Sequence, residues 1–576
     1  MSTFYDQASL VLIPSGYKED VVYSQKPTDG SGDLTFTRAS DGTRVNSAGY
    51  VENVPWNLLL QSNTFNTTWV LSNATVTSGQ SGYDGTNNAW EFDASGIAQV
   101  SQSVSTSGIQ TFSVYAKAGS ENGLFLRANG GNNPRCFFNL DSGTIGNEAG
   151  GLIDSEMLNV GNGWYRCTII YSDTTNEARI YVANNSGGFP TSGSIYIQDA
   201  QLNTGSTAKP YFPTTDRQNV PRLTYEGGCP SLLLEPQATA LNTNSENAAG
   251  WTAVGSTITS DSTISPDGTQ NADTITYSSS GSRIQQEFTI SDTKATLSVF
   301  VKSNTGDGAY LIIRNNTTAT NLVTVAFTGE TFTAGAGGQT ISYANGWYRI
   351  SVTATSGISS GNTLRAYIYS DSGQGVVSGS SVYVWGMNCT NTSYLQSYIP
   401  TTSAAVTRVA DVCNKTGISS LIGGTSGTVF FDITTNPVLS SASYKQFCYY
   451  FDSASAQSYL YLNSVNQIST NVNWGSLLYS TPLQPNTRYK VALVYAPNDF
   501  ALYINGVSVA TASSGTPKNN ERISIGQLAG TEMCEFVFNQ YTHFPSRLTN
   551  DQLEVLTGDS YQSYIAMADA LNYYYD

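Results

Sequence analysis

Apolar and polar residues alternate over many short stretches of this 576-residue chain. In Phe112-Ser113-Val114-Tyr115-Ala116-Lys117, for example, Phe, Val and Ala alternate with residues that can face water. A period of two is typical of a half-buried strand, and Gly-rich or Asn-Gly turns separate these stretches. Strands that bury one face assemble into packed pairs of sheets. The pattern therefore predicts an all-β protein made of tandem β-sandwiches.

One predicted hairpin occurs twice. Asn162-Gly163-Trp164-Tyr165-Arg166 recurs as Asn345-Gly346-Trp347-Tyr348-Arg349. Asn-Gly supplies the positive φ that a tight hairpin turn needs, and the residues after it alternate as in a strand. Other stretches match in the same order: 57–63 with 240–245, 84–89 with 267–272, 112–117 with 297–302, 194–198 with 381–385, and 211–215 with 398–402. We therefore predict two duplicated jelly-roll domains, residues 56–219 and 239–412.

Three further segments complete the predicted organisation. Residues 1–55 hold short apolar strands such as Leu10-Val11-Leu12-Ile13, which is too little material for a core of its own. We interpret this segment as an anchor whose removal leaves the sandwiches folded; the alternative is an edge hairpin of the first repeat. Residues 220–238 are predicted to be a linker packed on both repeats. Residues 413–576 form a last sandwich.

The last sandwich shows a different strand pattern and ends in the clearest helical signal of the chain. Predicted strands cover residues 427–433, 447–451, 459–462, 489–495, 500–507 and 522–526. Thr549 is a suitable N-cap for a helix over 550–556, and a second helix is predicted over 561–575.

Composition narrows the function classes. The net charge is −16, which argues against nucleic-acid binding because phosphate recognition needs a basic face. Seven cysteines without a C-x-x-C spacing indicate buried free thiols and no zinc site. The start of the chain lacks a basic signal-peptide region, and no apolar run reaches the roughly 18 residues of a membrane helix. We expect synthesis in a cytoplasm and no membrane insertion.

The duplicated segments resemble the carbohydrate-binding-module-like domains of phage virion proteins. The Asn-Gly-Trp-Tyr-Arg hairpin, the strand 112–117 and the closing Tyr398-Ile399-Pro400-Thr401-Thr402 carry this resemblance. Residues 34–46 and 229–237 resemble segments of the same tail or head fibre proteins. The last domain is similar to the laminin-G/concanavalin-A-like lectin superfamily over 489–495, 502–507 and 523–526. The resemblance implies a fibre or adhesin in a virion, commonly a homotrimer, that contacts a host surface.

Catalysis has little support in the sequence. A Ser-His-Asp arrangement would have to use His543, the single histidine, which we interpret as structural. One histidine also excludes a multi-histidine metal centre. Glycosidase chemistry needs two carboxylates at a set separation, and nothing pairs the candidates Asp432, Asp452, Asp499 and Glu535. We predict no catalytic residue and no enzyme activity, with a glycan depolymerase as the least favoured alternative.

Sugar binding needs aromatic faces flanked by polar groups. Trp474 lies in a polar, loop-like stretch, so we select Trp474, Asn473 and Tyr479 as candidate glycan contacts. Trp164 and Trp347 recur at matching positions and are predicted to be core residues instead. No cofactor is expected. The turns Asp84-Gly85 and Asp267-Gly268 are candidate ligands of a structural calcium ion, but an ordinary turn is the favoured interpretation of both.

The leading hypothesis is a non-enzymatic phage fibre or adhesin subunit. Its N-terminal segment would contact other tail or head proteins, and its β-sandwich modules would bind a host cell-surface polysaccharide from the assembled virion. Sugar-binding sites that are weak one by one would together give strong attachment through multivalency. The alternative is a purely structural tail or capsid decoration protein that binds no sugar.

Overall fold

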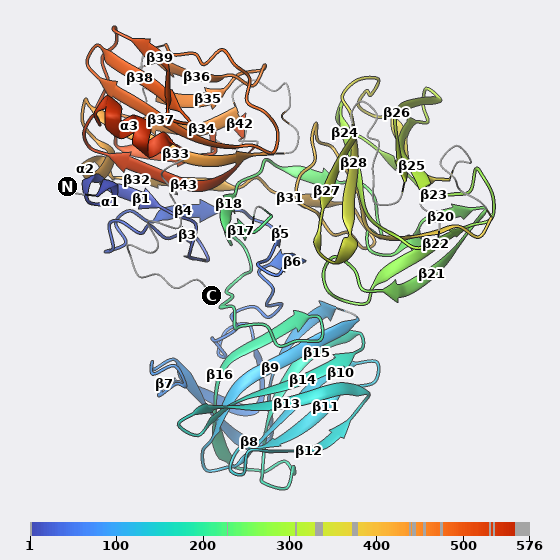
Figure 1. Cartoon of the computed structure of the whole chain (residues 1–576). Helices are drawn as coiled ribbons and strands as arrows, with labels where there is room; N and C mark the ends of the chain where they lie inside the picture. The colour runs from blue at the N-terminus through green and yellow to red at the C-terminus, as the bar shows by residue number, and fades with distance from the viewer. Residues whose placement is uncertain are drawn as a thin grey trace. The chain divides into compact units, whose positions relative to one another are not determined.

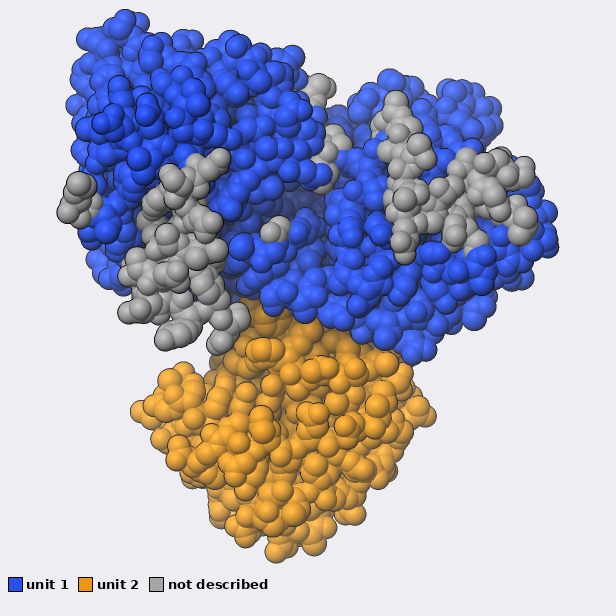
Figure 2. Space-filling view, in the orientation of Figure 1, with its two compact units in different colours: residues 1–54, 219–576 blue, residues 55–218 orange. Residues whose placement is uncertain are grey.

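The computed structural model describes residues 3–106, 108–226, 228–305, 308–328, 338–370, 378–436, 439, 445–452, 457–472, 476–528, 532–533 and 536–558. The chain forms two compact units, Pro55–Gln218 and the combination of Met1–Val54 with Asn219–Asp576 (Figure 2). Antiparallel strands dominate both units (Figure 1), which confirms the predicted all-β class of tandem sandwiches. Predicted helix 561–575 lies outside the described residues.

The unit Pro55–Gln218 contains the first repeat. Its strands are β7 (Val70–Gln80), β8 (Ala89–Thr106), β9 (Ile109–Ala118), β10 (Gly123–Gly130), β11 (Arg135–Asn139), β12 (Thr144–Ala149), β13 (Leu152–Gly161), β14 (Trp164–Ser172), β15 (Thr175–Ala183) and β16 (Gly193–Thr204). They run in the order β12-β11-β10-β15-β8-β16-β9-β14-β13, with β7 also on β8. The long strand β8 pairs with β16 through its first half and with β15 through its second half. It therefore joins the two layers around one apolar core.

The second repeat has two separate sheets. Its elements are β19 (Ala238–Ala240), η1 (Ala248–Gly250), β20 (Thr252–Val254), β21 (Ser256–Thr263), β22 (Ala272–Tyr277), β23 (Arg283–Thr289), β24 (Ala295–Ser303), β25 (Gly308–Asn315), β26 (Thr320–Thr328), β27 (Gly338–Ser342), η2 (Ala344–Gly346), β28 (Tyr348–Ala354), β29 (Thr363–Tyr369), β30 (Ser381–Thr390) and β31 (Val406–Arg408). The β30 sheet runs β21-β22-β30-β24-β28-β27, and the β29 sheet runs β20-β23-β29-β25-β26. Their facing side chains form the core of this repeat.

The recurring hairpin has the predicted turn in both repeats. Asn162 and Gly163 take φ values of 52° and 78°, and Asn345 and Gly346 take 59° and 74°. These left-handed conformations are those that Asn and Gly tolerate best, and they match the twist of the flanking strands. The turn joins β13 to β14 in the first repeat and β27 to β28 in the second.

The tryptophan of the hairpin is buried in both repeats, and the arginine makes matching contacts. Trp164 and Trp347 are 1% and 0% exposed, which confirms that they are core residues. Arg166 and Arg349 each donate to a serine hydroxyl on the next strand and to a backbone carbonyl. The partners are Ser113 and Lys209 in the first repeat, and Ser298 and Gln396 in the second. The repeated sequence therefore encodes a repeated packing solution.

The C-terminal sandwich includes strands from distant parts of the chain. Its elements are α1 (Phe4–Gln7), β1 (Leu10–Leu12), β2 (Tyr17–Lys18), β3 (Val21–Val22), β4 (Leu34–Thr37), β17 (Arg222–Thr224), β18 (Ser231–Leu233), β32 (Val412–Thr416), α2 (Ser419–Ile422), β33 (Gly427–Thr435), β34 (Lys445–Phe451), β35 (Gln457–Leu462), β36 (Ile468–Val472), β37 (Arg488–Ala496), β38 (Asp499–Ile504), β39 (Val507–Ala512), β40 (Arg522–Ile525), β41 (Gln527–Leu528), β42 (Glu532–Met533), β43 (Phe536–Phe544) and α3 (Asn550–Thr557). One layer runs β17-β18-β43-β33-β37-β38-β39, and the other runs β2-β3-β4-β32-β40-β34-β35-β36. Thr549 caps α3 as predicted.

The N-terminal segment belongs to this sandwich. Strand β1 pairs with β43, with Leu10 opposite His543, and β4 pairs with β32 (Figure 1). Leu10, Leu34 and Phe36 are fully buried in the C-terminal core. The alternative of an edge hairpin on the first repeat is therefore wrong. Removal of the segment would take strands out of both layers, so we now expect it to destabilise the C-terminal sandwich.

The segment 220–238 also contributes strands. β17 and β18 form a hairpin whose second strand meets β43, while β19 pairs with β30 and β31 of the second repeat. A second hairpin from the N-terminal segment, β5 (Gly42–Val45) with β6 (Val51–Val54), lies nearby in the same unit. The linker pairs with the second repeat and completes the C-terminal sandwich, whereas its packing on the first repeat stays a prediction.

The cysteines are free thiols over the described residues. Cys136, Cys167, Cys389, Cys413 and Cys448 are buried, as predicted, whereas Cys229 is exposed in the β17–β18 turn. Cys534 lies outside the described residues. Within the described part of the chain, no helix has the length and apolar character needed to span a membrane.

Candidate functional site

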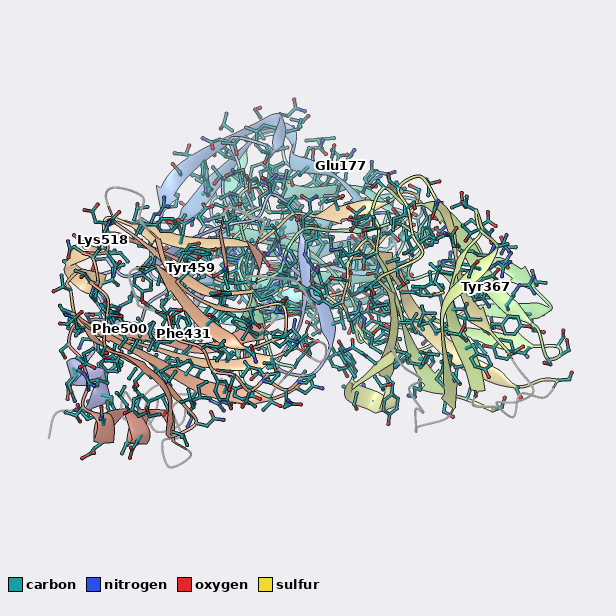
Figure 3. All side chains as sticks on the ribbon, turned by 90° about the horizontal axis from the view of Figure 1, so that it is seen from above. Glu177, Tyr367, Phe431, Tyr459, Phe500 and Lys518 are labelled. Atoms are coloured by element: carbon teal, nitrogen blue, oxygen red, sulfur yellow. The ribbon has the colours of Figure 1, made fainter. Side chains whose placement is uncertain are left out.

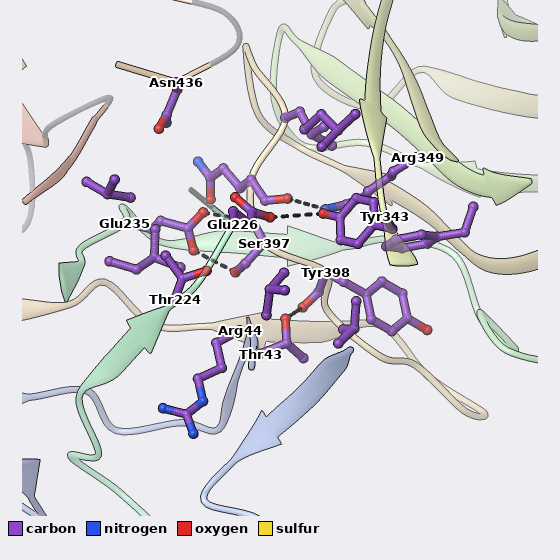
Figure 4. Close-up of a pocket in the computed structure, with 18 residues that line it drawn as sticks. Thr43, Arg44, Thr224, Glu226, Glu235, Tyr343, Arg349, Ser397, Tyr398 and Asn436 are labelled. Atoms are coloured by element: carbon purple, nitrogen blue, oxygen red, sulfur yellow. Dashed lines mark hydrogen bonds between the residues drawn. The ribbon is translucent and has the colours of Figure 1, made fainter. Parts of the chain in front are cut away.

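A small cavity lies where the β5–β6 hairpin, the β17–β18 hairpin and the second repeat meet (Figure 4). Its volume is about 50 Å³, which suits water and not a sugar. The polar groups on its wall bind one another: Ser397 donates to Glu235, Tyr343 to Glu226, and Thr43 to the carbonyl of Tyr398. This cavity is a packed junction and not a ligand site.

A buried ion-pair network lies beside this junction. Asp411 binds Arg38 at 2.8 Å and Arg222 at 2.5 Å, and Glu235 binds Arg222 and Arg408 at 2.8 Å each. These side chains are at most 5% exposed. Burial alone would raise the pKa of Glu235, but Arg408 and Arg222 lower it to about 2. The network joins segments near β4, β17, β31 and β32 and has a structural role.

A better candidate is the outer face of the β29 sheet in the second repeat. Alternation along the strands points one set of side chains into the core, including Leu311 and Ile368. The opposite set lines a groove of about 370 Å³. We call this set the tyrosine–arginine face: Arg283, Tyr310, Ile312, Arg314, Asn321, Thr324, Tyr367 and Tyr369. Figure 3 labels Tyr367 on this sheet.

Strand register places these residues in adjacent rows across the sheet. Arg283, Tyr369 and Tyr310 lie opposite one another on β23, β29 and β25. The next row contains Tyr367, Ile312 and Thr324. The third contains Arg314, Asn321 and Arg365, and we include Arg365 in the face because it is paired with Arg314. Directly paired residues in a sheet are about 5 Å apart, so Tyr310 and Tyr369 are neighbours, and Tyr367, two residues away on β29, extends this strip of tyrosines. Arginines lie at both ends of that strip.

Hydrogen bonds fix the polar side chains of this face. Arg365 donates from Nε to Glu287 at 2.7 Å and from Nη1 to the Tyr367 hydroxyl at 3.0 Å. Burial opposes the charge on Arg365, but these hydrogen bonds more than offset it and raise its pKa. Arg314 donates to the Asn321 amide oxygen at 3.0 Å.

The remaining arginine of the face, Arg283, donates to Gln285 at 2.9 Å and to the Gly281 carbonyl at 3.2 Å. The donors are therefore held in place before any ligand arrives. A half-buried aromatic ring can stack on a sugar ring, and oriented donors beside it can bind the hydroxyls of the sugar.

The first repeat presents a related face on β10 and β15. Phe125, Tyr181 and Phe189 cluster there, with ring centroids 5.3–5.8 Å apart. Arg179 donates to Glu177 at 2.7 Å and to the Tyr181 hydroxyl at 3.3 Å. An Arg-x-Tyr motif with an acidic partner thus occurs on the corresponding strands, β15 and β29, of both repeats.

Of the three candidate glycan contacts in the C-terminal sandwich, Tyr479 is the one that lies among the described residues. Trp474 and Asn473 lie outside the described residues. Tyr479 is half-buried and packs on the C-terminal core, and its backbone N–H donates to the Ile468 carbonyl. Tyr479 thus takes part in packing, and the role of the three residues in glycan binding stays a prediction.

His543 is fully buried between tyrosines. Its Nδ1 lies 3.3 Å from the Tyr450 hydroxyl and its Nε2 lies 3.5 Å from the Tyr495 hydroxyl, while Tyr450 also bonds Tyr541. Burial lowers the pKa of His543 to about 3, so the ring is neutral at neutral pH. These contacts place the ring inside the sandwich, with the structural role expected for it.

The candidate carboxylates lie in separate ion pairs. Asp432 pairs with Arg488, Asp452 with Lys518, and Asp499 with Arg547, at 2.7 to 3.2 Å. Glu535 lies outside the described residues. Asp499 and Arg547 border a groove of about 460 Å³ next to β38, but its aromatic side chains, Phe500 and Tyr503, are buried. That groove therefore lacks the open ring surface of the tyrosine–arginine face.

The two Asp-Gly turns are ordinary hydrogen-bonded turns. Asp84 accepts from the backbone and hydroxyl of Thr86, and Asp267 accepts from those of Thr269. Among the described residues, no cluster of three or more His, Cys, Asp or Glu side chains has the arrangement of a metal site.

The sequence did hold a signal for the tyrosine–arginine face. Thr363-Leu364-Arg365-Ala366-Tyr367-Ile368-Tyr369 alternates small or aliphatic residues with Arg and Tyr. On a sandwich strand, this pattern places large hydrogen-bonding side chains on the open side. An aromatic residue in a strand is usually assigned to the core, and for that reason the face was not among the predicted contacts.

Comparison with solved structures returns several β-sandwich proteins. The Ruminococcus gnavus IT-sialidase CBM40 bound to alpha2,3 sialyllactose is 15% identical, covers 24% of this chain and 86% of its own, and has a TM-score of 0.22. The tandem CBM22-1-CBM22-2 domain of Paenibacillus barcinonensis Xyn10C is 14% identical and covers 59% and 98%, with a TM-score of 0.19. Domains LG4-5 of the mouse laminin alpha1 chain are 11% identical and cover 47% and 87%, with a TM-score of 0.16. No protein-family model and no curated protein matches the chain.

Proposed function

We propose that the chain is a non-catalytic glycan-binding protein and that the tyrosine–arginine face binds its ligand. The observation that supports this most is the strip of Tyr369, Tyr310 and Tyr367 between oriented arginines. Tyr310 and Tyr369 are half-buried, so part of each ring is open to a ligand while the strand holds it in place. Rings stack on the apolar side of a pyranose, and arginine and amide groups bind its oxygens.

A glycan array probed with the full-length protein tests this proposal. We expect Tyr310→Ala and Tyr369→Ala each to weaken binding by about 1–2 kcal/mol, a five- to thirtyfold loss, because an open ring surface is removed. Tyr23→Ala, the same change at an exposed tyrosine away from the face, should bind like the natural chain. Absence of binding on the array would support the structural decoration alternative instead.

We further propose that the protein is an adhesin of a phage virion, attached to a host-surface polysaccharide. The resemblance of residues 34–46, 229–237 and the Asn-Gly-Trp-Tyr-Arg hairpins to virion proteins supports this role. Immuno-electron microscopy of purified virions should place the protein on the particle, and its absence from the particle would contradict the role.

Sedimentation analysis tests whether the protein is a homotrimer, as the resemblance implies. Release of reducing ends from the bound polysaccharide would show a depolymerase.

A further inference from the structure

We propose that the ligand of the tyrosine–arginine face is an acidic polysaccharide whose carboxylate groups pair with Arg283 and Arg314. This rests on the proposed function and adds the chemical class of the glycan. The inference comes from the charges on the face, from the free donors of its arginines and from the related face of the first repeat.

The described side chains of this face carry more positive than negative charge. Arg365 is neutralised by its ion pair with Glu287. Arg283 and Arg314 donate to amide and carbonyl oxygens, which are neutral acceptors, and neither forms an ion pair with a described residue. Over the described residues, two guanidinium charges therefore remain without an acidic partner on the open face of a chain whose net charge is −16. A neutral sugar would not need them.

The donors left on these arginines suit a carboxylate. Arg314 uses Nη1 for Asn321, so among its described contacts Nε and Nη2 remain for a side-on fork. Arg283 uses Nε and one N–H of Nη1, so among its described contacts Nη2 and the second N–H of Nη1 remain. Planar guanidinium groups bind carboxylates with two parallel hydrogen bonds, a geometry that a sugar hydroxyl cannot match.

The spacing of the two arginines indicates a repeating acid. Arg283 and Arg314 lie two strands and four residues apart, with Tyr369 and Tyr310 between them. Strand spacing and rise place their Cα atoms roughly 16 Å apart. A ligand that reaches both must extend over more than one ring and carry acidic groups at intervals, as a polysaccharide built of uronic acids does.

The first repeat has the same excess of charge on its related face. Arg179 is neutralised by Glu177. Arg127 and Arg135 donate to neutral oxygens, those of Asn129 and Asn133. The aromatic residues differ between the repeats, since Phe125 and Phe189 take part in the first. Each aromatic cluster is thus accompanied by two arginines that form no ion pair with a described residue, which favours one class of anionic ligand for both.

Matched polysaccharides test the inference on the full-length protein. Polygalacturonate, hyaluronan and alginate are immobilised, each beside its carboxyl-reduced neutral form, with heparin as a sulfated probe. We expect binding to at least one acidic form, at least tenfold weaker binding to its reduced form, and weakening as salt rises. Arg283→Gln and Arg314→Gln should each lower affinity for the acid at least fivefold, and Arg314→Lys should restore it only in part. Arg522→Gln, at an exposed arginine on β40, is the matched control.

The outcomes separate this inference from the proposed function. Equal binding to an acidic form and its reduced form, or binding to neutral glycans alone, would overturn the acidic ligand and leave glycan binding in place. Binding to heparin alone would overturn the assignment of carboxylates. Absence of binding to every acidic and neutral probe would overturn both proposals.

Discussion

Single residues show how much the surroundings decide a side chain's role. His543, the single histidine and a structural residue by our interpretation of the sequence, lies on β43 with both ring nitrogens facing tyrosine hydroxyls. Burial keeps its imidazole neutral. By contrast, Tyr310 and Tyr369 look like ordinary strand residues, yet the register leaves their rings on the open side of the β29 sheet. Position in the fold, more than residue type, separates the two cases.

His543 should make the C-terminal sandwich less stable in acid. An unfolded histidine takes up a proton near pH 6.5, whereas the folded His543 does so only near pH 3. Between these values the unfolded chain binds more protons, so stability falls as pH falls, by at most about 1.4 kcal/mol per pH unit. In His543→Gln this dependence should be flatter from pH 6 to 4. Native-state hydrogen exchange of β43 amides at each pH measures the difference, and equal slopes would contradict the expectation.

At the scale of elements, the buried ion-pair network fixes how separate segments meet. Arg38 follows β4, Arg222 lies in β17, Arg408 lies in β31, and Asp411 precedes β32. A buried pair adds little stability over an apolar packing, but loss of one partner leaves charge without compensation. The network therefore selects one arrangement of these segments over others.

Asp411→Asn should destabilise this unit strongly. The amide keeps the shape but removes the charge that Arg38 and Arg222 share, at a cost of about 3–5 kcal/mol. Arg547→Gln breaks the more exposed pair with Asp499 and should cost at most about 1 kcal/mol. Calorimetry of both variants measures the shifts in the unfolding transition. Similar shifts in the two variants would argue against the structural role of the network.

Element patterns were predictable where the signal is local. Alternation and the Asn-Gly turns predicted the strands, the duplicated hairpins and the buried Trp164 and Trp347. The pairing of β1 with β43 was not predictable, since three apolar residues carry no information about a partner more than 500 residues away. The tyrosine–arginine face was missed for a related reason: which side of a strand is open depends on the sheet packed against it.

At the scale of the whole molecule, the N-terminal segment is part of the C-terminal sandwich. We expect deletion of residues 1–37 to unfold that sandwich, because it removes β1 and β4 and the buried Leu10, Leu34 and Phe36. The unit 55–218 has its own core and should keep its transition. Calorimetry of the chain without residues 1–37 should show that the unfolding transition of the C-terminal sandwich is lost and that of the unit 55–218 is retained. Retention of both would mean that the segment is dispensable.

The pairing of β1 with β43 also sets an order of events during synthesis. Leu10 and His543 are separated by 533 residues. At 5–20 residues per second, a ribosome needs roughly 30 to 100 seconds to make β43 after β1 has been made. Throughout that interval the nascent chain must keep an apolar strand unpaired while the repeats fold behind it. A translation product that stops before β43 would never bury this strand, and it would remain a ready target for chaperones and proteases.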